Sequence, residues 1–217
     1  ILLIPMMLFS LASCNKNDNK ITIAEVTHSL FYAPLYVAKN AGFFNDVGLD
    51  IYIVKTPGSD KVMASLLSKD AQIGLMGPEA SVYVYNNGQE NYAINFAQLT
   101  QKDGSFLLGR EKIDNFDYSM LKGKTIIGGR KGGMPEMTLE HVLKKNGLTI
   151  TQNGQDKNAD VNIRVDVSFD ATSGVFVAGE SDYVTAFEPT ASQIEATKKG
   201  YIVSSIGKDS GIVPYTC

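Results

Sequence analysis

The segment Pro34-Leu35-Tyr36-Val37-Ala38-Lys39-Asn40-Ala41-Gly42, followed closely by Gly48-Leu49-Asp50-Ile51-Tyr52-Ile53-Val54-Lys55, indicates an α/β chain. A proline in the first turn and a glycine just past the end are typical of a helix, here over residues 34–41. Leu49, Ile51 and Ile53 alternate with more polar residues, which predicts a strand over residues 48–55. A helix followed directly by a strand is the repeating unit of α/β proteins.

The same alternation extends to both sides of this segment. A strand is predicted before it at 21–26, and Ser59 is predicted to cap a helix after it. Residues 78–87 are predicted to be helical because Pro78 suits the first position of a helix and Asn86-Asn87-Gly88 suits its end. Their alternating run 81–85 would also suit a strand. Further strands are expected at 72–75, 93–99 and 105–109.

A second series of alternating strands and helices begins at residue 124. The sequence predicts strands at 124–128, 161–165, 183–187 and 201–205, and helices at 135–146, 171–178 and 191–199. Two successive series indicate two α/β lobes, each with a mostly parallel sheet, that meet near residues 100–105. In such sheets ligands bind at the carboxyl ends of strands, so functional residues are expected directly after the strands.

The composition and charge of the chain exclude several classes of function. The chain has 217 residues, 20 Lys+Arg and 23 Asp+Glu, and a formal charge of −3. A weakly acidic chain is a poor candidate for nucleic-acid binding, which usually requires a basic face. Hydrophobic residues make up 44% of the chain, as in ordinary globular proteins. The two cysteines, Cys14 and Cys217, lie near opposite ends and cannot form a disulfide framework or a four-ligand zinc site.

The N-terminal residues are predicted to direct the protein to a membrane. Residues 1–12 are apolar apart from one proline and one serine, which is too short for a membrane span but suits the apolar part of a signal peptide. Leu11-Ala12-Ser13-Cys14 resembles a bacterial lipobox, so lipidation is expected at Cys14, with residues 1–13 removed and 14–20 as a polar tether. The alternative is a buried N-terminal helix with a chance cysteine.

Further segments carry a family resemblance. Tyr32-Ala33-Pro34 through Ala41-Gly42-Phe43-Phe44, together with Gly48-Leu49-Asp50-Ile51, resembles the solute-binding proteins of ABC importers for thiamine precursors, sulfonates and nitrate. Similar segments are Asp70-Ala71-Gln72-Ile73-Gly74, Leu121-Lys122-Gly123-Lys124 and Phe187-Glu188-Pro189.

The resemblance implies a two-lobed type II periplasmic-binding-protein fold. Residues 21–103 would form the first lobe, 104–206 the second, and 207–217 the start of a crossover back to the first. Members of this family are usually longer, so the chain is expected to be truncated, with apolar surface left exposed on an incomplete first lobe.

The loop Gly128-Gly129-Arg130-Lys131-Gly132-Gly133-Met134-Pro135 follows a predicted strand and opens a predicted helix. Glycines allow a ligand to approach the backbone, and free N–H groups at a helix start favour an electronegative group. Gly132, Gly133 and Met134 are therefore candidate ligand contacts. The loop is not a phosphate-binding Walker A loop, because Met134-Pro135 stands where that motif requires Lys-Ser/Thr. The alternative is a tight turn with solvated basic residues.

Four residues after the first strand are candidates because the family places ligand contacts there: Thr27, His28, Phe31 and Tyr32. The aromatic pair could stack on a flat ring, or could instead pack in the core. A lone histidine such as His28 is more often a surface or hydrogen-bonded residue.

Glu79 and Glu188 each follow a predicted strand, and carboxylates in a cleft recognise N–H donors or cations. Either could instead cap a helix. Glu188 is the stronger candidate because Phe187 and Pro189 match the family motif. Gln98 and Thr100, at the predicted hinge, could donate to a ligand between the lobes.

The resemblance implies a binding protein that needs no cofactor or metal. The motifs of nucleophilic and metallohydrolase catalysis are absent from the sequence. The related aminopyrimidine synthase has a lysine and a histidine after its third strand, where this chain reads Gly74-Leu75-Met76-Gly77-Pro78-Glu79-Ala80. The expected protein is a monomeric extracytoplasmic lipoprotein that delivers a small polar nutrient, with a thiamine-precursor pyrimidine favoured, to an ABC permease. A sulfonate- or nitrate-type ligand, or a sensing role without transport, is the alternative.

Overall fold

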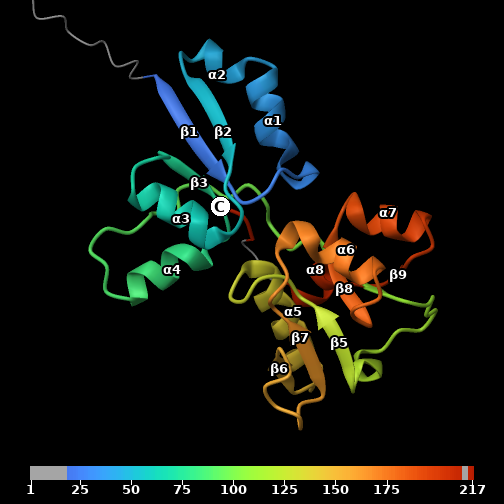
Figure 1. The fold of residues 1–217 in the computed structure, drawn as a ribbon. Coiled ribbons are helices and arrows are strands. Elements are labelled where there is room, and N and C mark those ends of the chain that lie inside the picture. The colour runs from blue at the N-terminus through green and yellow to red at the C-terminus, as the bar shows by residue number, and fades with distance from the viewer. Residues whose placement is uncertain (1–18, 212–214) are drawn as a thin grey trace, which may run out of the picture.

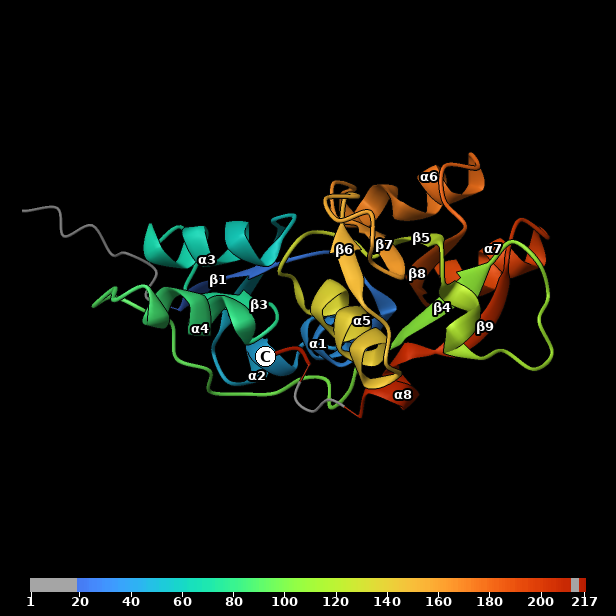
Figure 2. The same ribbon diagram turned by 90° about the horizontal axis from the view of Figure 1, so that it is seen from below.

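The computed structural model describes residues 19–211 and 215–217, so the expected lipidation site Cys14 lies outside the described residues. The described chain forms two α/β bodies, each built around its own sheet (Figure 1). Seen from below, the two bodies lie side by side along the molecule (Figure 2). None of the helices in the described ranges is long and apolar enough to cross a membrane.

The first body contains a parallel three-stranded sheet in the order β2-β1-β3. Its strands are β1 (Lys20–Glu25), β2 (Asp50–Lys55) and β3 (Ile73–Leu75). Successive residues of β1 face opposite sides, so Ile23 joins the core under α1 while Ala24 joins the core under α3 and α4. The helices are α1 (Ala33–Asn40), α2 (Phe43–Asp46), α3 (Ser59–Leu67) and α4 (Glu79–Asn86).

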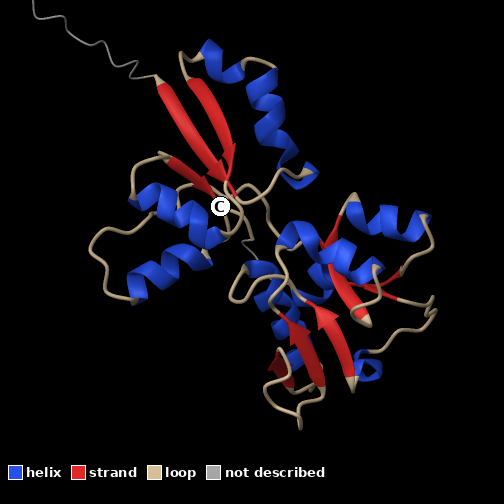
Figure 3. Ribbon diagram, viewed as in Figure 1, coloured by secondary structure: helices blue, strands red, loops and turns tan. Residues whose placement is uncertain are grey.

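The second body contains a six-stranded mixed sheet in the order β6-β7-β5-β8-β4-β9 (Figure 3). β4 runs antiparallel to both β8 and β9, and the remaining pairs are parallel. The strands are β4 (Ser105–Gly109), β5 (Lys124–Ile127), β6 (Ile150–Gln152), β7 (Val161–Arg164), β8 (Tyr183–Phe187) and β9 (Tyr201–Ser205).

Helices cover both faces of this second sheet, and its core follows the strand alternation. Leu107 and Ile126 pack under α5 (Met134–Lys145), whereas their neighbours Leu108 and Ile127 pack under α6 (Thr172–Val177) and α7 (Thr190–Ala196). The short α8 (Ile206–Ser210) and the 3₁₀ turns η1 (Leu30–Tyr32), η2 (Tyr118–Leu121) and η3 (Phe169–Ala171) complete the described elements.

Two segments of chain run side by side where the bodies join. Thr100 and Thr216 form an antiparallel bridge, and the Cys217 N–H donates to the Met76 carbonyl at 2.9 Å. Residues 215–217 thus return to the first sheet next to the end of β3. The lobe boundaries at 103/104 and 206/207 stay predictions.

Most predicted elements are confirmed within two or three residues, including the helical interpretation of residues 78–87. The predicted strand 93–99 is wrong: residues 93–98 have no regular structure, and Ile94 and Phe96 are 78% and 76% exposed. Their apolar alternation suits a strand, but residues 93–98 join no ladder of the described sheets. Ser59 is the first residue of α3 rather than its cap, which is Gly58. The elements β6, α2 and α8 were not predicted.

Candidate functional site

The loops that follow β1, β2, β5, β7 and β8 converge between the two bodies and enclose two pockets. The first, here called the Glu188 pocket, has a volume of about 460 Å³ and is lined by the loops after β1, β7 and β8. The second, the Glu79 pocket, has a volume of about 710 Å³ and is lined by α3, α4 and the loops after β1, β2, β5 and β7. Phe169 and Asp170 line both pockets. Each pocket therefore draws its walls from both bodies, as a ligand site between two lobes requires.

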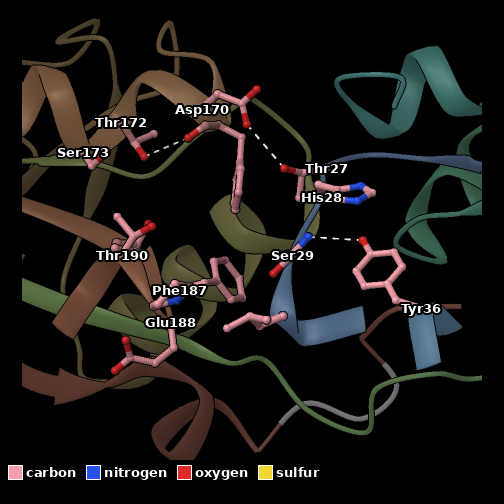
Figure 4. Close-up of a pocket in the computed structure, with 15 residues that line it drawn as sticks. Thr27, His28, Ser29, Tyr36, Asp170, Thr172, Ser173, Phe187, Glu188 and Thr190 are labelled. Atoms are coloured by element: carbon pink, nitrogen blue, oxygen red, sulfur yellow. Dashed lines mark hydrogen bonds between the residues drawn. The ribbon is translucent and has the colours of Figure 1, made fainter. Parts of the chain in front are cut away.

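Asp170 makes one set of contacts that cross between the bodies. Its Oδ2 lies 2.6 Å from the ammonium group of Lys55, at the end of β2. Its Oδ1 accepts a longer hydrogen bond of 3.4 Å from the hydroxyl of Thr27, after β1 (Figure 4). The two side chains of the ion pair are 44% and 48% exposed, so water screens it only in part.

A second set of crossing contacts involves the glycine loop 128–133. Arg130 reaches the first body, where its guanidinium pairs with Asp60 at 3.1 Å and donates to the Pro57 carbonyl at 3.2 Å. The hydroxyl of Tyr83, on α4, donates to the carbonyl of Gly132 at 3.1 Å. The alternative in which Arg130 is only solvated is therefore wrong, because Arg130 ties the loop to the opposite body.

The same loop uses its backbone donors internally. The N–H of Gly132 donates to the Glu136 carboxylate at 3.0 Å, and the N–H of Gly133 donates to the Arg130 carbonyl at 3.2 Å. Glu136 is 1% exposed, and burial together with its hydrogen bond to Glu140 raises its pKa to about 7. Gly132 and Gly133 line the Glu79 pocket, but these two donors are already occupied by acceptors of the chain itself.

Glu79 is the most unusual polar group of the site. It is the first residue of α4, is 7% exposed, and lines the Glu79 pocket. Neither of its carboxylate oxygens has a hydrogen-bond partner in the described chain. Burial raises its pKa, and the nearby Ser59 hydroxyl and Met134 backbone offset this only in part. Glu79 is also the acidic residue in the first turn of α4, where a negative charge stabilises the helix, so the helix-start alternative applies to it although its carboxylate makes no hydrogen bond to the described chain.

The carboxylate of Glu188, the stronger candidate from the sequence, has hydrogen-bond partners within the chain. It lines the Glu188 pocket, yet both carboxylate oxygens are bound by Ser192 in the first turn of α7. Oε2 accepts the Ser192 N–H at 3.0 Å and Oε1 accepts its hydroxyl at 2.8 Å. Figure 4 shows the carboxylate pointing away from Thr27 and Asp170. Capping, the alternative interpretation, therefore describes Glu188 in this structure.

His28 belongs to a small polar cluster at the end of β1. Its Nδ1 contacts a carboxylate oxygen of Glu25, which is fully buried, and its ring stacks on Tyr36 with centroids 4.7 Å apart. The Tyr36 hydroxyl donates to the other Glu25 oxygen at 2.7 Å. His28 and Tyr36 both line the Glu188 pocket, so this hydrogen-bonded histidine also faces the cleft.

The other candidates lie around the pockets without lining them. Phe31 packs against Phe187 and Tyr215, with ring centroids 5.6 and 5.9 Å away, and Tyr32 is buried in the core, which raises its pKa to about 12. These contacts agree with the core-packing alternative for the aromatic pair.

The two hinge candidates bond within the chain. The Gln98 side chain donates to the Thr100 carbonyl at 3.1 Å, and the Thr100 hydroxyl accepts the Thr216 N–H at 2.9 Å. Met134 opens α5 and lies beside Gly77. Thr27, His28, Glu79, Gly132, Gly133 and Glu188 are the candidates that the structure places in a pocket lining.

Several lining residues were missed by sequence reasoning. Phe169 and Asp170 follow β7, so the rule that places function after strands could have found them. Met63 and Leu67 carry the apolar spacing of α3, which is indistinguishable from an ordinary core face. Among residues 19–211 and 215–217, no group of three or more His, Cys, Asp or Glu side chains could hold a metal ion.

The chain is similar to several known proteins. It is 47% identical over 212 residues to the "Putative binding protein YtlA" of Bacillus subtilis (strain 168), a match that covers 97% of this chain and 61% of that protein. The chain therefore spans about three fifths of the length of this curated relative.

Solved structures share its fold at low identity. The nitrate-binding protein NrtA from Synechocystis PCC 6803 matches with a TM-score of 0.67 and 17% identity, over 91% of this chain and 54% of that one. The aliphatic sulphonate binding protein SsuA from Escherichia coli matches with a TM-score of 0.65 and 13% identity, over 91% and 64%. Both are periplasmic binding proteins, which confirms the expected fold class. The model of the family described as NMT1/THI5 like matches residues 31–211, and the chain belongs to this family.

Proposed function

We propose that this protein is the extracytoplasmic solute-binding component of an ABC importer. It would capture a small polar, ring-containing nutrient between its two lobes, with a thiamine-precursor pyrimidine as the favoured ligand. Family membership supports the general role, and the names of the structural relatives supply the sulfonate and nitrate alternatives. Delivery to a membrane permease, lipid anchoring through Cys14 and a monomeric state belong to the same proposal.

The observation that carries the proposal is the cleft itself. Both pockets have walls from both bodies, and the Lys55–Asp170 and Asp60–Arg130 pairs connect the two sides. A ligand in either pocket would touch both bodies only when they are close together. Binding would thus shift the population toward the closed arrangement, and capture requires no chemical step.

The favoured ligand class rests on the acceptors in the cleft. The Glu79 carboxylate is unpartnered in the described chain, whereas the Gly132 and Gly133 N–H groups are occupied. An aminopyrimidine offers N–H donors to such a carboxylate, and a nitrate or sulfonate offers none.

A thermal-shift screen of the full-length protein tests the proposal. The panel contains aminopyrimidines, thiamine, alkanesulfonates, nitrate, riboflavin and amino acids. A ligand at 100 times its dissociation constant adds about 2.7 kcal/mol of stability, which is readily seen as a higher melting temperature. We expect a shift with an aminopyrimidine. A shift with sulfonates or nitrate alone would support the alternative, and no shift with any compound would contradict the proposed role.

A further inference from the structure

We propose that Glu79 is a specificity-determining residue that selects ligands presenting N–H donors, such as amines and aminated heterocycles, and rejects oxyanions. This inference rests on the proposed function and adds the chemical class of ligand that the Glu79 pocket accepts. It separates this chain from its structural relatives named for sulfonate and nitrate.

The first support is the state of the carboxylate. Glu79 is more than nine-tenths buried, lines the larger pocket, and has no hydrogen-bond partner for either oxygen in the described chain. An ionised carboxylate without partners is costly to bury, so such groups normally find a partner. A ligand that supplies N–H donors would provide the partner that the chain does not.

The local sequence leaves room for this carboxylate. Gly77 lies next to it, and a Cβ atom at that position would overlap the Glu79 Oε2 atom and the Met134 side chain. The pocket is also lined by apolar groups of α3 and α4, including Met63, Ala80 and Val84. The carboxylate thus shares the pocket with apolar groups that suit the body of a ring.

The other charged groups around the pocket strengthen the contrast. Asp60 is paired with Arg130, and Asp170 is paired with Lys55, so both of these carboxylates already have cations. The backbone donors of Gly132 and Gly133, which could have received an oxyanion, are bonded to Glu136 and Arg130. Lys131 also lines the pocket as a cation, but it is exposed, so water screens its charge, whereas the free Glu79 acceptor is buried.

An anion placed beside Glu79 would also face a like charge. Repulsion between like charges is strong in a buried site because little water screens it. A ligand with an ammonium or amino group would instead form a charge-assisted hydrogen bond with Glu79. Loss of one such bond weakens binding by about 10- to 100-fold.

The test compares the full-length wild type with Glu79→Gln and Glu90→Gln by isothermal titration calorimetry. Glu90→Gln is the matched control, since it makes the same change at an exposed carboxylate outside the lining of both pockets. The probes are an aminomethyl-substituted aminopyrimidine and benzylamine as N–H donors, with ethanesulfonate and nitrate as oxyanions. Thermal melting of each variant verifies that it is folded.

We expect the wild type to bind an N–H donor probe and to give no heat with the oxyanions. Glu79→Gln should weaken binding of the amine about 10- to 100-fold, and Glu90→Gln should change it less than twofold. Unchanged amine affinity in Glu79→Gln, or wild-type preference for an oxyanion, would overturn the inference and leave solute binding intact. Binding of neither class would contradict the proposed function together with the inference.

Discussion

Replacement of Lys55 by Gln is expected to weaken ligand binding although Lys55 lies outside the lining of both described pockets. Its ammonium pairs with Asp170 across the cleft at 2.6 Å, so the contact exists only while the two bodies are close. The substitution removes the charge and keeps most of the side-chain length. A changed affinity would therefore report on closure rather than on direct contact with the ligand.

The expected loss of affinity follows from the solvent exposure of the Lys55–Asp170 ion pair. Both side chains are a little under half exposed, and ion pairs of this kind contribute up to about 1 kcal/mol. If the free protein is mostly open, the closed fraction falls by the same factor as the ion-pair equilibrium, and the apparent dissociation constant rises accordingly. A loss of about 0.5–1 kcal/mol corresponds to a two- to fivefold weaker affinity.

Isothermal titration calorimetry with the ligand found in the screen would measure this change. Lys144→Gln is the matched control, because Lys144 pairs with Glu140 at 2.7 Å within α5 and does not cross the cleft. The difference between wild type and Lys55→Gln should shrink in 1 M salt, where the Debye length is about 3 Å. An unchanged affinity in Lys55→Gln, or an equal change in Lys144→Gln, would refute the role of the ion pair in closure.

Three further predictions concern the site and the core. Gly77→Ala should displace the Glu79 carboxylate, because the added methyl group overlaps it, and amine binding measured by calorimetry should fall as in Glu79→Gln; normal affinity would contradict this. Burial raises the pKa of Glu79 in the folded protein above its unfolded value, so the ionised carboxylate destabilises the fold. This destabilisation is fully present above the folded pKa and absent below about pH 4. Glu79→Gln should therefore melt higher than wild type at pH 8, and scanning calorimetry should show this gain disappearing as the pH falls toward 4 rather than growing. Phe176→Ala should lower the free energy of unfolding by about 3–5 kcal/mol in urea titrations, because the ring is fully buried and stacks under the Arg110 guanidinium; a loss below about 1 kcal/mol would refute this.

The fold was largely predictable because its signals are local. Gly42 and Gly147 follow helices with positive φ angles, and the paired apolar residues Leu107-Leu108 and Ile126-Ile127 mark strands buried on both faces. The segment 93–99 was mispredicted because alternation alone cannot reveal whether a pairing strand lies nearby. The three-residue strand β6 is too short to give a periodic signal.

The site was less predictable because its character depends on partners distant in sequence. Their position after strands led us to expect Glu79 and Glu188 at the cleft, and both line a pocket, but the sequence favoured Glu188, whose carboxylate bonds to Ser192, over the unpartnered Glu79. Glu188 accepts the Ser192 N–H in the first turn of α7, which is the helix-capping role that its position also suggested. The isolation of Glu79 follows from the surrounding tertiary packing, and the Lys55–Asp170 pair joins residues 115 positions apart.

A crystal structure of the full-length protein grown with an aminopyrimidine would test the central claim most directly. We expect ligand density between the two bodies in the Glu79 pocket, with a ligand N–H within hydrogen-bond distance of the Glu79 carboxylate. The Lys55–Asp170 and Asp60–Arg130 contacts should be present in that complex. Ligand density outside the cleft, or an empty cleft at a saturating ligand concentration, would contradict the claim that this protein captures such a solute between its lobes.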